Sequence, residues 1–161
     1  MVKSREELHC PKCGELLHLR DHRKRVCKRE GGKKEWLLIG RYRCEKCNCL
    51  HTALPDCLVK YKHYRSSIIE GVIDETVSED DLAYEDYPCA TTMLRWLDWF
   101  IRNIAAIEGQ IRSAAMRFLD FTDEFLKSTE SLLEELRKRI SRGWLRRVEK
   151  IIYNSGGGLV V

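Results

Sequence analysis

Two cysteine pairs constrain the fold of this chain more than any other feature. Cys10 and Cys13 form one Cys-x-x-Cys pair, and Cys44 and Cys47 form a second. A pair with this spacing places two thiolates on one tight turn. Two such turns facing each other form a tetrahedral site of four sulfurs, which suits Zn²⁺. We therefore expect these four cysteines to bind Zn²⁺ as a structural cofactor.

The residues after each pair agree with a metal site. Gly14 and Asn48 directly follow the second cysteine of each pair, and both residue types accept a positive φ, which lets the backbone curl around an ion. The alternatives are four reduced, unliganded thiols or a thioredoxin-like redox pair. A redox pair would be expected next to a βαβ unit, which the flanking sequence does not show.

Composition favours a chain of one domain or two small ones. It has 161 residues, of which 43% are hydrophobic, enough for a real core. The sequence has no apolar run long enough to span a membrane and no apolar segment at its charged start. Eight cysteines without an export signal favour metal binding in a reducing compartment over disulfides. We expect a cytoplasmic protein with no membrane association.

Charge is distributed in blocks along the chain. Residues 1–65 carry a net charge of +9, residues 66–135 carry −11, and residues 136–161 carry +6. The basic ends are suited to a polyanion such as nucleic acid. They could instead neutralise the acidic middle, within one chain or between subunits.

The first 57 residues have the pattern of a zinc ribbon. Residues 15–20 and 35–44 have the apolar content of short strands. Between them, residues 20–34 read as a basic insertion loop with a turn at Gly31-Gly32. The loop either contacts phosphates or is a solvated, mobile insertion. The small sheet would depend on its metal, because its own core is small.

Residues 58–102 have the pattern of a helix-turn-helix domain. After a basic aromatic connector, a first helix is expected from Ser66 or Ser67 to about Thr76, and a short second helix from Ser78 to Tyr87. A third helix is expected to open near Pro88. It would be the recognition helix, with Thr91, Thr92 and Arg95 presented to base edges and phosphates.

Residues 103–153 are expected to form a long helical hairpin, followed by a flexible tail over residues 154–161. The third helix continues through an apolar heptad stripe that comprises Leu97, Phe100, Ile104, Ile107, Ile111, Ala114, Phe118, Phe121 and Phe125. A break is expected where Ser128 or Thr129 can cap a new helix, which would run to Ile152 with Gly143 as a kink. The stripe is either an intramolecular core or a dimer interface, and its width favours a homodimer through the C-terminal helices.

Part of the chain resembles a known module. The segment from Tyr42 to Pro55, which contains Cys44 and Cys47, is followed by a Val59–Tyr64 connector and a helix. This order resembles the N-terminal module of bacterial insertion-sequence transposases and of related small bacterial proteins, over about residues 8–102. The resemblance implies a zinc ribbon and a DNA-binding helix-turn-helix. Full transposases continue into a domain with three catalytic carboxylates, whereas the acidic residues after position 100 here lie on helical faces.

The expected fold is thus a small α+β zinc ribbon followed by an all-α helix-turn-helix and a long helical hairpin. The expected function is zinc-dependent DNA binding associated with a mobile element, without catalytic activity and alongside a separate transposase or recombinase subunit. The candidate nucleic-acid-binding residues are Arg23, Lys24, Arg25, Lys28, Arg29, Thr91, Thr92 and Arg95. The alternatives are a protein–protein adaptor acting through acidic and helical surfaces, or a regulator derived from a transposase.

Further cysteines and histidines leave two interpretations open. Cys27 with His22, or Cys49 with His51, could contribute to a second metal site. The favoured interpretation is that Cys49, Cys57 and Cys89 are small buried residues. None lies in a sequence context that would activate a thiol, so we expect no enzyme.

Overall fold

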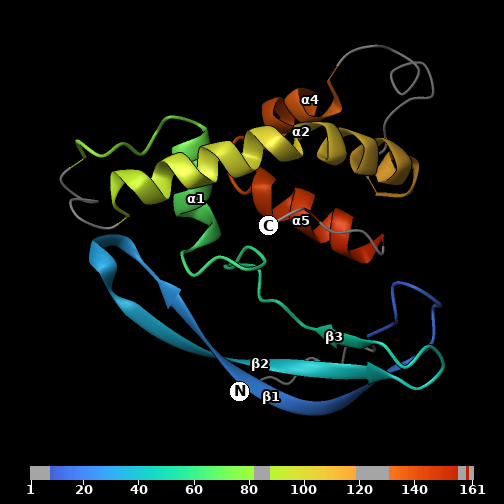
Figure 1. The fold of residues 1–161 in the computed structure, drawn as a ribbon. Helices are drawn as coiled ribbons and strands as arrows, with labels where there is room; N and C mark the ends of the chain where they lie inside the picture. Colours follow the sequence, from blue (N-terminus) through green and yellow to red (C-terminus); the bar gives the residue numbers. More distant parts are fainter. Residues whose placement is uncertain (1–7, 82–87, 119–130, 156–158, 160–161) are drawn as a thin grey trace.

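The computed structural model describes residues 8–81, 88–118, 131–155 and 159. It consists of a sheet layer and a helical layer (Figure 1). The sheet comes first in the chain and contains β1 (Leu17–Lys28), β2 (Lys34–Cys44) and β3 (Leu50–Thr52), with the short 3₁₀ turn η1 (Glu30–Gly32) between β1 and β2. The helices are α1 (Ser66–Ile73), α2 (Ala90–Phe118), α4 (Leu132–Arg139) and α5 (Trp144–Asn154).

The basic segment expected as a loop is mostly a strand. β1 pairs with β2 in antiparallel register from Leu17 opposite Cys44 to Lys28 opposite Lys34, with a bulge between Leu19 and Asp21. An antiparallel pair can keep one face in water, which accommodates lysine and arginine side chains along the strand. The expected glycine turn is confirmed, with φ of 64° at Gly31 and 70° at Gly32.

The sheet has little core of its own. Its buried cluster consists of Cys27, Ile39 and Leu58, with half-buried Leu37, Leu54 and Cys57 packed against it. β3 adds only three residues, pairing with β2 between Arg41 and Arg43. A core this small stabilises a long hairpin poorly.

The helical layer holds the main core. Val59 and Tyr64 of the connector belong to one buried cluster with residues of α1, α2, α4 and α5, so the connector is part of this layer. α2 contacts α1, α4 and α5. The fully buried side chains at its centre include Ile107, Ile111, Leu132, Trp144, Leu145 and Val148.

Two of the three helices expected in residues 58–102 are found. α1 begins at Ser66 as expected, and α2 begins at Ala90, just after Pro88. The second expected helix is not helical in its described part, because residues 78–81 form a turn; its remainder lies outside the described residues. A helix-turn-helix arrangement therefore stays a prediction.

The last expected helix is divided in two. α4 ends at Arg139, and α5 begins after Gly143, which has a φ of 84°. A kinked single helix would need helical dihedrals at Gly143, and the left-handed conformation separates the helices instead. Ser131 is the N-cap of α4 and accepts a hydrogen bond from the backbone N–H of Glu134 at 3.1 Å. The expected caps Ser128 and Thr129 lie outside the described residues.

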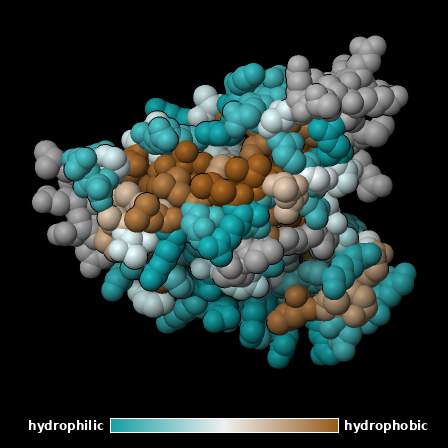
Figure 2. Space-filling model, turned by 45° about the horizontal axis from the view of Figure 1, so that its top comes forward, coloured by the Kyte–Doolittle hydropathy of each residue, from teal (hydrophilic) through white to brown (hydrophobic). Residues whose placement is uncertain are grey.

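The apolar stripe of α2 is only partly buried. Phe100, Ile107 and Ile111 are in the core, whereas Ile104 is 38% exposed. Leu94 and Ile101, on the same side as Ile104, are 64% and 65% exposed. Figure 2 shows a hydrophobic band over the helical layer. Phe121 and Phe125 lie outside the described residues, as do the side chains of Ala114 and Phe118.

Among the described helices, none combines the length and the apolar content that a membrane crossing requires.

Candidate metal centre and basic surfaces

The four cysteines of the two pairs come together. The sulfurs of Cys10, Cys13, Cys44 and Cys47 all lie within 4.8 Å of one another. The Sγ atoms of Cys10 and Cys47 are 3.6 Å apart, and those of Cys13 and Cys44 are 3.4 Å apart. Cys10 and Cys44 are buried, and the other two cysteines are half-buried. This arrangement can hold one metal ion with four sulfur ligands.

Local backbone geometry forms both turns. The N–H of Gly14 donates to the carbonyl of Cys10 at 2.8 Å, and the N–H of Cys44 donates to the carbonyl of Cys49 at 3.0 Å. The expected positive φ values are confirmed, at 75° for Gly14 and 57° for Asn48. The side-chain carbonyl of Asn48 also accepts a hydrogen bond from Nε of Arg43 at 2.7 Å. Each turn is therefore set by residues next to its cysteines.

The electrostatics of the cluster favour a bound cation. Burial acts against ionisation of Cys10, but the backbone N–H groups of Lys12 and Cys13, with the neighbouring thiols, lower its pKa to about 6. The N–H of Glu15 favours the Cys13 thiolate, but the thiol of Cys44, burial and the other two thiols together raise the pKa of Cys13 to about 12. Several thiolates in one small space repel one another unless a cation neutralises them.

His51 lies next to the four-cysteine cluster, whereas the sequence suggested it as a ligand, with Cys49, of a second metal site. It is 8% exposed, and its Nε2 lies 3.4 Å from Sγ of Cys10. Its Nδ1 lies 3.4 Å from the hydroxyl of Tyr153 on α5. An N–H donated to a ligand sulfur orients that sulfur and tunes its charge. The contact between His51 and Tyr153 could not be predicted from the sequence, because the two residues are far apart in the chain.

The second metal site considered from the sequence does not form among the described residues, where the four-cysteine group is the one cluster of at least three potential ligands. Cys27 is buried instead, beside Cys57, and burial raises the pKa of its thiol. Cys49 and Cys57 are half-buried. The expectation that Cys89 is buried is wrong, because it is exposed just before α2.

The candidate basic residues of the hairpin differ in solvent exposure and in the contacts they make. Arg23 and Lys24 are exposed on β1, and Arg25 is half-buried. Lys28 lies 5.0 Å from the centre of the Tyr64 ring, and Tyr64 packs edge-on against Trp96 of α2. Lys28 therefore helps to connect the two layers.

Arg29 is also engaged within the fold. Its Nε donates to a carboxylate oxygen of Glu35 at 2.8 Å across the end of the hairpin. By contrast, no ion pair joins Arg23, Lys24 or Arg25 to an acidic residue in the described part of the chain. These three residues are the best placed of the hairpin set for contact with an external anion.

The candidate residues of α2 form a separate surface. Thr91 and Arg95 are exposed, and Thr92 is half-buried with its hydroxyl 3.3 Å from Sγ of Cys89. They lie at the start of α2 in the helical layer, whereas Arg23, Lys24 and Arg25 lie in the sheet layer (Figure 1). The structure thus has two candidate surfaces.

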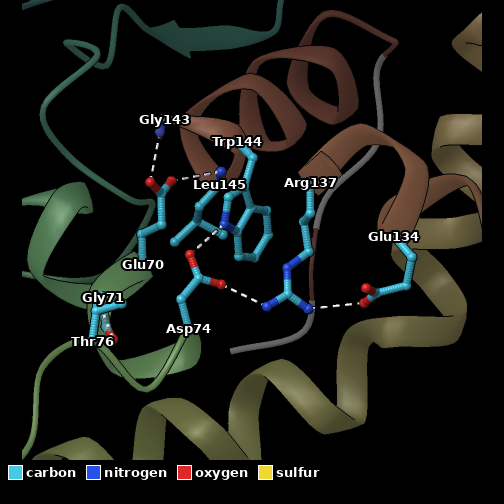
Figure 3. Close-up of polar contacts among 9 residues, drawn as sticks. All are labelled: Glu70, Gly71, Asp74, Thr76, Glu134, Arg137, Gly143, Trp144 and Leu145. Atoms are coloured by element: carbon cyan, nitrogen blue, oxygen red, sulfur yellow. Dashed lines mark hydrogen bonds and ion pairs between the residues drawn. The ribbon is translucent and has the colours of Figure 1, made fainter. Parts of the chain in front are cut away.

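Two acidic residues from the middle of the chain make hydrogen bonds and ion pairs inside the fold (Figure 3). Glu70, only 6% exposed, accepts hydrogen bonds from the N–H of Gly143 at 2.6 Å and of Leu145 at 2.9 Å. Asp74 accepts from the indole of Trp144 at 2.8 Å and from Arg137 at 2.6 Å. These two carboxylates hold the N-terminal end of α5, so they do not contribute to an acidic docking face.

A family profile matches residues 10–96, which run from the first cysteine of the cluster to Trp96 on α2. The span is more than half of the chain. The chain belongs to the DUF6431 family. That family is described as a domain of unknown function. The DUF6431 match includes the four-cysteine cluster, the hairpin and α1, while α4 and α5 follow it. No curated protein and no solved structure matches the chain.

Proposed function

We propose that this DUF6431 protein is a zinc-dependent, cytoplasmic DNA-binding protein, associated with a mobile element and without catalytic activity of its own. Zn²⁺ would bind Cys10, Cys13, Cys44 and Cys47, because four sulfurs at these separations suit a borderline-soft ion with tetrahedral preference. The ion would act structurally and hold the two turns at one end of the hairpin.

The charge of the β1–β2 hairpin carries the proposal. Residues 17–44 contain ten lysines and arginines but only three acidic residues. Two of those acidic residues, Asp21 and Glu35, already pair with arginines of the hairpin. A long two-stranded ribbon with unpaired cations can follow a DNA groove or its phosphates. Thr91, Thr92 and Arg95, at the start of α2, would supply the base contacts.

Acidic residues in the middle of the chain would repel DNA phosphates, but Glu70 and Asp74 make their contacts within the fold. Both carboxylates face the N-terminal end of α5 or Arg137. Their charge is therefore compensated locally, and they repel phosphates less than their number in the sequence would indicate.

Fluorescence anisotropy with random duplex DNA at two salt concentrations tests this function. Replacing Arg23, Lys24 and Arg25 with alanine is expected to weaken binding to all duplexes and to reduce the salt slope by about 0.9 per lost phosphate contact. Arg95→Ala is expected to weaken a selected site more than random DNA. A control that replaces exposed Lys46, Lys138 and Arg142 removes the same charge elsewhere. Equal losses in the two triple variants, or no binding at low salt, would contradict the proposal.

A second candidate function rests on the exposed side of α2. Leu94, Ile101 and Ile104 form an apolar stripe with half-buried Leu97, at heptad spacing. This stripe suits a homodimer, or an adaptor that docks on a separate transposase or recombinase subunit. Asp98 and Arg102, which pair at 2.9 Å along one side of the stripe, favour the homodimer. In an antiparallel pairing, each would lie near the oppositely charged residue of the second copy.

A further inference from the structure

A large cavity separates the sheet from α5. Its volume is about 510 Å³, within the range of small-molecule and cofactor sites. β1, β2 and β3 line one side, residues between Ala53 and Tyr61 line another, and α5 lines the third. None of the four cysteines lines the cavity, although His9 and Pro11 beside Cys10, and also His51, do. The cavity is therefore a feature that the metal centre does not explain.

The cavity lining carries an excess of positive charge. The cationic side chains, from three separate segments, are Arg23, Arg25, Lys60, Arg146 and Lys150, and the carboxylates are Asp56 and Glu149. Asp56 lies 3.9 Å from both Arg146 and Lys150, at the limit of an ion pair, and is itself exposed. Such loose pairs leave the arginine and lysine available to an anion. The charge balance of the lining selects an anionic ligand over a neutral one.

Aromatic rings line the same space. Tyr42, Trp99 and Tyr153 come from β2, α2 and α5, and Tyr61 comes from the connector. Tyr61 is 54% exposed, with its own neighbour Lys60 5.1 Å from the ring centre. Its φ is 63°, a left-handed conformation that is unfavourable for a bulky side chain. A strained residue that exposes an aromatic ring beside a cavity points to a binding role, since such strain concentrates at functional sites.

We propose that this cavity binds a nucleotide of single-stranded nucleic acid. Arg146 and Lys150 on α5, with Arg23 and Arg25 on β1, contact the phosphates, and the Tyr61 ring stacks on the base. Cationic side chains that follow a backbone and aromatic rings that stack on bases are the two elements of single-strand recognition. The proposal rests on the proposed nucleic-acid function. The single-strand site shares Arg23 and Arg25 with the residues proposed to contact duplex DNA, and it adds Tyr61, Arg146 and Lys150.

The test uses a fluorescein-labelled oligothymidine of about 12 nucleotides, within the length range of single-strand sites. Tyr61→Ala is expected to weaken its binding roughly tenfold. The double variant Arg146→Ala, Lys150→Ala is expected to weaken it by a similar or larger factor and to leave duplex binding within about twofold. Lys138→Ala with Arg142→Ala removes equal charge from exposed positions outside the cavity, and is expected to have little effect.

Glu149→Gln is expected to change oligothymidine affinity in the opposite direction to the other cavity variants. It removes one of the two carboxylates of the lining, so the oligothymidine is expected to bind several-fold more tightly. A gain in affinity cannot result from misfolding. Thermal unfolding of each variant establishes that the loss-of-binding variants are folded, which is expected because Tyr61, Arg146 and Lys150 are exposed.

The outcomes separate this inference from the proposed function. If the cavity variants weaken oligothymidine binding no more than the control variant does, the cavity site is overturned, and the proposal of duplex binding is unaffected. Duplex binding without oligothymidine binding would do the same. Competition by polyglutamate as strong as by unlabelled oligothymidine would also overturn it, because the site would then select charge alone. Absence of binding to both nucleic acids would overturn both proposals.

Discussion

The hydroxyl of Tyr153 on α5 lies 3.4 Å from Nδ1 of His51 on β3. The two rings meet edge to face, with centres 6.4 Å apart. Because the other ring nitrogen of His51 lies 3.4 Å from Sγ of Cys10, one side chain connects the four-cysteine cluster to the helical layer. The connection also crosses the boundary of the DUF6431 match, which ends before α5.

His51→Ala is expected to weaken metal binding about 10- to 100-fold, the usual effect of removing a partner of a metal ligand. The measurement is competition for Zn²⁺ against a chelating dye at neutral pH. Tyr153→Phe removes only the hydroxyl, so it is expected to keep the metal affinity while lowering the free energy of unfolding by about 1 kcal/mol. Unchanged affinity in His51→Ala would show that His51 only fills space beside Cys10.

Loss of the metal is expected to affect the two layers unequally. Cys44→Ser removes a buried thiol from the cluster, and the hairpin core of Cys27, Ile39 and Leu58 is too small to compensate for loss of a metal. Hydrogen exchange is therefore expected to show lost protection in β1, β2 and β3, with protection kept in α1, α2 and α5. The control is Cys89→Ser, which changes an exposed thiol outside the cluster. Simultaneous loss of protection in the helices would show that the layers unfold as one unit.

The cysteine cluster was predictable from the sequence because the residues that form each turn are adjacent in the chain. Two spaced pairs and the residues Gly14 and Asn48 specify the turns, and the structure has both positive φ values. The length of β1 was not predictable in this way. Its second half is a run of basic residues with weak strand propensity, and it is ordered by cross-strand partners such as Leu38 opposite Lys24 and Trp36 opposite Val26.

The division between α4 and α5 also depends on distant contacts. Gly143 alone could be a kink or a helix end. The N-terminal end of α5 is stabilised by Glu70, which lies 73 and 75 residues away from Gly143 and Leu145 in the sequence. His51 and the cavity between the layers were missed for the same reason, because their partners come together only when the sheet packs on α5.

Glu70→Gln is expected to destabilise the protein by about 2–3 kcal/mol. The carboxylate is 6% exposed and accepts one backbone hydrogen bond on each oxygen. A glutamine amide would keep one of these bonds, place its NH₂ group against an N–H donor, and remove the negative charge at the N-terminal end of a helix. Urea unfolding followed by circular dichroism measures the change. The exposed Glu75→Gln at the end of α1 is the matched control; equal effects would contradict the capping role.

Ile101→Glu tests the apolar stripe of α2 as a dimer interface. Ile101 is 65% exposed, so the substitution is expected to leave the stability of one chain nearly unchanged while it places a charge in the centre of the stripe. Sedimentation velocity is expected to show a dimer for the unmodified chain and a monomer for the variant. Leu38→Glu is the control, because Leu38 is 66% exposed but lies on the hairpin. Dissociation by Leu38→Glu instead would place the interface on the sheet.

Glu149→Gln is expected to change how stability depends on pH. Burial raises the pKa of Glu149 above its ordinary value of 4.5, although the N–H of Lys60 and the charges of Lys60 and Lys62 act in the opposite direction. The folded state therefore holds this proton more tightly than the unfolded chain. Stability falls as pH rises from the unfolded pKa through the folded one, and the full penalty is present above the folded value.

Glutamine has no charge to desolvate, so the variant is expected to unfold at a higher temperature than the unmodified chain at about pH 7 and at a similar temperature at about pH 4. Thermal unfolding in a series of buffers measures the difference between the two curves. Glu79→Gln, at an exposed position in the turn after α1, is the control and is expected to leave the curve unchanged. A destabilised Glu149→Gln at neutral pH would mean that the contacts of the carboxylate with Lys60 and Lys62 outweigh its burial. The charge of Glu149 would then stabilise the cavity wall.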